Sequence, residues 1–159
     1  MPDNTFLLDK YIFPLFAVTQ GGLVLQVKRF LGSGFWADEV GHFITCKHVL
    51  DGLAKGELPV IGLPFSDRRD HFIRVLSSVS HPTFDIAVAT ADIIEPKSAL
   101  PLYRGPLGLG LDVQAFGFTD AGRECTSYQL DVRLLRGYVS RHSPDSLGLP
   151  SPSLLEVSF

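Results

Sequence analysis

Short apolar runs separated by turn residues leave few folds open to this chain. In the first of these runs Leu23, Leu25 and Val27 alternate with Gln26 and Lys28. This period of two marks a half-buried strand. Similar runs follow at about ten-residue intervals, bounded by glycine, proline or polar clusters. They lie near residues 35–37, 43–46, 58–63, 71–79, 86–90, 111–118, 128–139 and 154–159. The pattern predicts an all-β protein built as a barrel or a sandwich.

Composition limits the class and the partners. The chain has 159 residues, 45% of them hydrophobic and 19% charged, which is typical of a globular protein of domain size. The net charge is -3, and the basic pairs Lys28-Arg29 and Arg68-Arg69 are short and separate, so we expect no nucleic-acid partner. Pro14 interrupts the apolar run from Tyr11 to Val18. We therefore expect neither a signal peptide nor a membrane partner.

The cysteine count bears on the compartment. There are two cysteines, Cys46 and Cys125, and their spacing fits no disulfide framework. We therefore predict a reducing compartment and place the protein in the cytoplasm. Both cysteines are interpreted as small buried hydrophobic residues and not as nucleophiles.

The stretch from Gly32 to Leu50 carries the first candidate for chemistry. Two apolar runs, Phe35 to Ala37 and Phe43 to Cys46, are joined by a polar turn that ends in a glycine, which predicts a hairpin. His48 follows the second run and begins a segment long enough for about one or two helical turns. A rigid junction of strand and helix holds an imidazole still, as a catalytic base requires.

Two blocks of this sequence resemble the trypsin-like (chymotrypsin-fold) serine peptidases, in the bacterial style of the high-temperature-requirement proteases. The histidine block reads GSGF, ADEVG and TCKHVL, and the aspartate block reads HPTFDIAVA with Asp85 before an apolar strand. The resemblance implies a serine endopeptidase that acts on polypeptides. It also implies that His48 is the general base and that Asp85 orients it.

The nucleophile of that family has no counterpart here. Its Gly-x-Ser-Gly segment, which also supplies oxyanion donors, occurs nowhere in the sequence. Ser33 lies in a Gly-Ser-Gly triplet but precedes the histidine, whereas the family order is His, Asp, Ser. We therefore interpret Ser33 as a structural strand or turn residue. The chain resembles the N-terminal portion of such a peptidase, and we expect it to be inactive alone.

The resemblance implies a trypsin-like double β-barrel. A complete first barrel is predicted for residues 5–95, a proline- and glycine-rich linker for 96–110, and a partial second barrel for 111–159. An incomplete barrel leaves strand edges open, so a complementing segment or chain is expected to cover it. No cofactor and no metal is predicted, because the remaining histidines lack ligand spacing: His42, His71, His81 and His142.

Three interpretations stay open from the sequence. The first is a trypsin-like peptidase that lacks its serine segment because the chain is truncated. The second is a degenerate peptidase-fold domain that serves as a protein-binding module. The third is an unrelated small β-barrel interaction domain.

Overall fold

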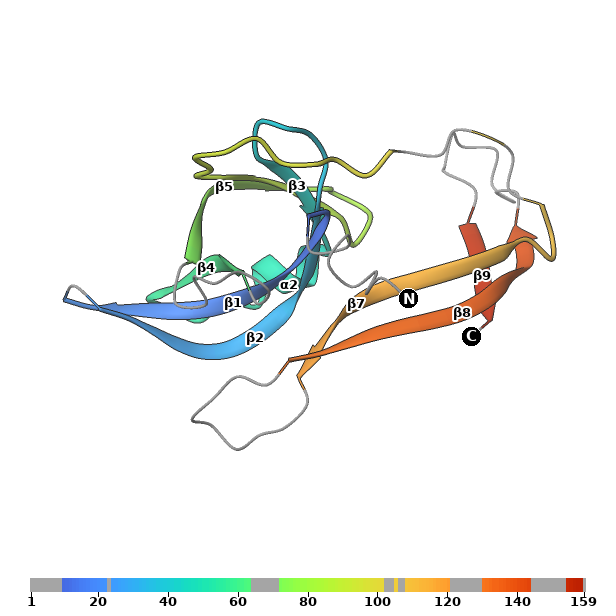
Figure 1. Cartoon of the computed structure of the whole chain (residues 1–159). Coiled ribbons are helices and arrows are strands. Elements are labelled where there is room, and N and C mark those ends of the chain that lie inside the picture. Colours follow the sequence, from blue (N-terminus) through green and yellow to red (C-terminus); the bar gives the residue numbers. More distant parts are fainter. Residues whose placement is uncertain are drawn as a thin grey trace.

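The computed structural model describes most of the chain. The described residues are 10–22, 24–63, 72–101, 105, 108–120, 130–143 and 154–158. They form a mostly-β structure with one closed sheet and one small open sheet, shown in Figure 1. The all-β class predicted from the alternating apolar runs is confirmed.

Six antiparallel strands close into a ring in the order β1-β2-β3-β6-β5-β4, with β4 pairing back onto β1. The strands are β1 (Ile12–Gly21), β2 (Val24–Trp36), β3 (His42–Thr45), β4 (Glu57–Gly62), β5 (Phe72–Ser80) and β6 (Ala87–Ala91). The predicted runs near residues 58–63, 71–79 and 86–90 are thus strands of one sheet. Two runs that the sequence separates, at 23–30 and 35–37, belong to the single long strand β2.

The inside of the ring is filled by apolar side chains. Phe13, Trp36 and Phe43 form an aromatic group, with ring centroids 4.5 Å apart for Phe13 and Trp36 and 5.3 Å apart for Phe13 and Phe43. Edge-to-face and tilted packing of this kind adds to the stabilisation from burial. The rest of this core is small or aliphatic: Leu15, Val49, Leu50, Ile61, Ala87, Ala89 and Ala91.

β1 is the strand that sequence patterns did not identify. Residues 12–18 are all buried, so the run lacks the alternation of polar and apolar positions that marks a half-exposed strand. Pro14 also argues against a central strand, because it has no N–H to donate. The register accommodates it: Pro14 is paired with Ser33 of β2, and the pairing with β4 begins one residue later at Leu15.

Helix α2 (Lys47–Asp51) follows β3 directly, as the sequence predicted. Val49 and Leu50 are buried and anchor the helix to the core. Gly32 allows this packing, because a Cβ atom at Gly32 would lie 2.7 Å from Cγ2 of Val49. Among the described residues no helix has the length and apolar character needed to cross a membrane.

The second sheet is formed by β7 (Asp112–Asp120), β8 (Leu130–Ser143) and β9 (Leu154–Ser158), with β8 in the middle. β7 lies against β1 and β2 of the ring. The Phe118 backbone N–H donates a part-buried hydrogen bond of 2.8 Å to Oγ of Ser33. Ser33 therefore ties the two sheets together. The division at residues 95 and 110 stays a prediction.

Candidate active site

Pairing of β3 with β6 brings the two predicted site residues together. Thr45 at the end of β3 is opposite Ala87 at the start of β6. His48 lies three residues after Thr45, and Asp85 lies two residues before Ala87. Two residues that are 37 positions apart in the sequence therefore meet at one end of the ring.

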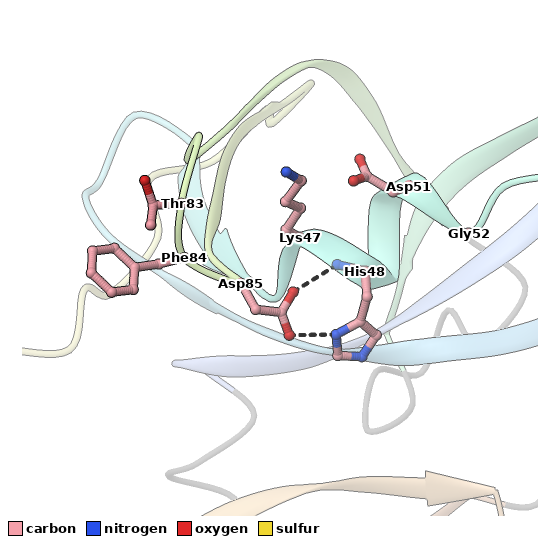
Figure 2. Close-up of a pocket in the computed structure, with 7 residues that line it drawn as sticks. All are labelled: Lys47, His48, Asp51, Gly52, Thr83, Phe84 and Asp85. Carbon is pink, nitrogen blue, oxygen red and sulfur yellow. Dashed lines mark hydrogen bonds and ion pairs between the residues drawn. The ribbon is translucent and has the colours of Figure 1, made fainter. Parts of the chain in front are cut away.

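Asp85 holds His48 through both of its carboxylate oxygens. Oδ2 lies 2.6 Å from Nδ1 of the imidazole, and Oδ1 accepts the His48 backbone N–H at 2.9 Å, as Figure 2 shows. An ionised carboxylate only accepts hydrogen bonds, so Nδ1 carries a proton and donates it. Nε2 is then the acceptor nitrogen of the ring. It points away from Asp85 on an imidazole whose side chain is 70% exposed.

These hydrogen bonds stabilise the charged form of Asp85. The backbone N–H of His48, followed by its side chain, holds the pKa of Asp85 below its usual value. The backbone N–H of Lys47 adds to the effect. A carboxylate that stays ionised can keep the imidazole in one tautomer and stabilise it when it becomes positively charged.

The loop that presents Asp85 is organised by His81. The backbone N–H groups of Thr83 and Phe84 donate to Nδ1 of His81, at 3.1 and 3.0 Å. The His81 N–H donates to the Ile86 carbonyl at 2.7 Å, which closes the loop at its base. The proline that follows His81 in the sequence indicates a loop position and no more than that. Its function as an acceptor for two backbone N–H groups was missed, because no sequence signal distinguishes it from a solvated histidine.

The structure contains a second histidine-carboxylate pair, which can be compared with His48 and Asp85. His42 and Asp38 make the same two contacts, from ring Nδ1 to Oδ2 and from backbone N–H to Oδ1. Asp38 also accepts the Val40 N–H at 3.0 Å, so this carboxylate organises the β2-β3 turn within five residues of chain. The His48-Asp85 pair instead joins two distant segments beside a hollow.

The hollow next to the pair is open to solvent. It is lined by Lys47, His48, Asp51, Gly52, Thr83, Phe84 and Asp85. Lys47 and Asp51 point to one side of α2 and His48 to the other in Figure 2.

The prediction that Cys46 is buried is wrong. Cys46 lies between β3 and α2 at the N-cap position and is exposed, because the chain leaves the ring there. Loss of hydration, followed by the negative charge of Asp85, raises the pKa of its thiol. The thiol of Cys46 is therefore less readily ionised than that of a free cysteine.

Ser33 lies on β2, and its hydroxyl is engaged with Phe118. The structural role predicted for it is confirmed. Cys125 and His71 lie outside the described residues, as does the side chain of His142. Among the described residues there is one group of three or more potential metal ligands, and it contains neither His42 nor His81.

Comparison with models of protein families and with curated proteins found no match to this sequence.

Proposed function

We propose that this chain carries the general base and the orienting carboxylate of a trypsin-like serine endopeptidase, with His48 as the base and Asp85 as its partner. The observation that carries the proposal is the two-point contact of Asp85 with the ring and the backbone N–H of His48. The contact fixes the tautomer whose Nε2 can take a proton from a hydroxyl.

The fold supports the same proposal. In this proposal the closed six-stranded ring is the first of the two barrels expected for the family, and the sheet of β7, β8 and β9 is part of the second. In the proposed reaction Nε2 of His48 accepts the proton of a serine hydroxyl as its oxygen attacks the peptide carbonyl. Asp85 stabilises the imidazolium, which then gives the proton to the leaving amine.

The serine and its oxyanion donors are proposed to come from a complementing segment or chain. The 159 residues contain no Gly-x-Ser-Gly segment. We propose that this partner adds strands beside β9, whose sequence Leu-Leu-Glu-Val-Ser alternates in the manner of a strand with one apolar face. The substrate is a polypeptide that crosses the exposed face of His48.

The proposal is tested by comparing the 159-residue chain with a longer chain that includes its downstream coding sequence. Cleavage of an unfolded protein is expected from the longer chain only, and a fluorophosphonate probe should label only that form. Asp85→Asn should lower kcat by up to about 10⁴-fold, as expected when the orienting carboxylate is lost. Asp38→Asn is the matched control, because it changes the other histidine-carboxylate pair, and it should leave kcat unchanged.

Two results separate the alternatives. Stoichiometric labelling of the 159-residue chain alone would contradict a nucleophile supplied from elsewhere. A downstream sequence that adds no cleavage, together with a monomeric 159-residue chain, would favour the binding-module interpretation. Without a partner for the second sheet, we expect the chain to self-associate in size-exclusion chromatography.

A further inference from the structure

We propose that Cys46, His48 and Asp85 form a zinc-binding site at the end of the ring. One donor atom from each residue lies within 4.8 Å of the other two, and all three residues are exposed. Among the residues that the structure describes, no other group of three such side chains comes together. The donors are a thiol sulfur, an imidazole nitrogen and a carboxylate oxygen, each of which is a ligand that Zn²⁺ accepts in proteins.

The local structure leaves the sulfur available to a metal. Cys46 occupies the N-cap position of α2, but its side chain makes no capping hydrogen bond. Its backbone is extended, with φ -72° and ψ 142°, between the end of β3 and the start of the helix. Cys46 and His48 are two residues apart in the chain, and a donor atom of Asp85 in the neighbouring loop lies within 4.8 Å of a donor atom of each.

Only small movements would bring the donors to a zinc geometry. Tetrahedral zinc with nitrogen and oxygen ligands separates those ligands by about 3.3 Å, since each bond is about 2.0–2.2 Å. Nδ1 of His48 and Oδ2 of Asp85 are 2.6 Å apart, so the pair must open by less than about 1 Å. The side chains are 70% and 55% exposed and have room to do so.

In this arrangement the metal replaces the proton that Nδ1 donates to Asp85. The thiol of Cys46 and Nδ1 of His48 each release one proton to solvent, and water completes the fourth position. Where the peptidase proposal also holds, zinc would inhibit the reaction, because it breaks the contact that orients the base. Zinc binding itself does not depend on that proposal.

The test is a titration of the metal-free 159-residue chain with Co²⁺, a spectroscopic substitute for Zn²⁺. One equivalent is expected to produce a thiolate charge-transfer band, and Zn²⁺ should displace it. Cys46→Ser should abolish the band, and His48→Gln should weaken binding at least about tenfold. The matched controls, Cys125→Ser and His42→Gln, should retain both the band and the affinity.

A second measurement needs no substitution. Iodoacetamide should alkylate Cys46 in the wild-type chain, and Zn²⁺ should protect Cys46 from alkylation. The alkylated fraction of Cys46 is measured by peptide mass spectrometry. Absence of a thiolate band in the wild type, a band that persists in Cys46→Ser, or alkylation of Cys46 unaffected by Zn²⁺ would each overturn the proposal. None of these readouts uses proteolysis, so they separate failure of the zinc site from failure of the peptidase proposal.

Discussion

At the scale of residues, two hydrogen-bonding side chains, Asp85 and His81, determine the geometry of the site. Asp85 fixes His48 through a ring nitrogen and a backbone N–H at once, and His81 fixes the loop that carries Asp85. The His81 ring also lies 4.9 Å from the Phe84 ring, which packs the loop on itself. The geometry of the pair therefore depends on a residue that does not touch His48 in any described contact.

We predict that His81→Ala loosens this loop without removing either member of the pair. Two backbone N–H groups lose their acceptor, at a cost of roughly 0.5–1.5 kcal/mol for each hydrogen bond. Amide hydrogen exchange of Thr83 and Phe84 should accelerate, whereas exchange in the core strand β1 should change little. His42→Ala is the control. If the amide exchange rates of residues 81–86 were the same in His81→Ala as in wild type, His81 would not be the residue that organises this loop.

Sequence patterns identified the members of the pair but not all of their surroundings. His48 and Asp85 were found because each lies in a distinctive local block of residues. The exposure of Cys46 was not predictable from sequence patterns. An apolar run shows which residues favour burial, but it does not show at which residue the strand ends. The role of His81 depends on a loop conformation that forms only when β5 and β6 pair.

At the scale of elements, β2 connects the parts of the molecule. It is paired with β1 and with β3. The side chain of Val49 in α2 packs closely against its Gly32, and its Ser33 hydroxyl accepts a hydrogen bond from a backbone N–H of β7. Arg29 of the same strand donates to Oε2 of Glu57 on β4 at 2.8 Å. These contacts predict two separable effects on stability.

Ser33→Ala should weaken the connection between the sheets. Loss of one part-buried hydrogen bond should lower the free energy of unfolding by about 0.5–1.5 kcal/mol. Trp36 is the single tryptophan and is 3% exposed, so its fluorescence reports unfolding of the ring in a urea titration. Ser78→Ala, at an exposed position of β5, is the control and should have no effect. Equal urea midpoints of unfolding for Ser33→Ala and Ser78→Ala would show that the Ser33 hydrogen bond to β7 does not stabilise the fold.

Glu57 should make stability depend on pH in the acid range. The backbone N–H of Ala54, followed by the Arg29 side chain, lowers the pKa of Glu57 below its ordinary value of 4.5. A lowered folded-state pKa stabilises the protein above the unfolded value, and this contribution is lost as the pH falls through the folded value. Glu57→Gln should therefore be less stable than wild type near neutral pH, and the gap should narrow below pH 4.5.

Urea titrations across this pH range measure the gap. Glu95→Gln, at an exposed position outside the strands, is the control. A gap between wild type and Glu57→Gln that stays constant from neutral pH into the acid range would contradict the assigned cause.

At the scale of the whole molecule, strand order creates the site. The order β1-β2-β3-β6-β5-β4 makes β3 and β6 neighbours although two strands separate them in the chain. The all-β class was predictable, because the strand period of two is visible in each exposed strand. The closed ring was expected only from the family resemblance, and the register was not predictable. Both depend on long-range pairing and on the fully buried strand β1, which has no alternating pattern.

The most direct test of the account is the protonation pattern of the His48 ring, read from two-bond ¹H–¹⁵N correlations of the selectively labelled chain at neutral pH. We predict that the neutral His48 ring carries its proton on Nδ1, with Nε2 bare, because Asp85 accepts from Nδ1. Asp85→Asn should abolish this preference, and Asp38→Asn should leave it intact. A wild-type His48 with the proton on Nε2, or one unaffected by Asp85→Asn, would contradict its assignment as an oriented general base.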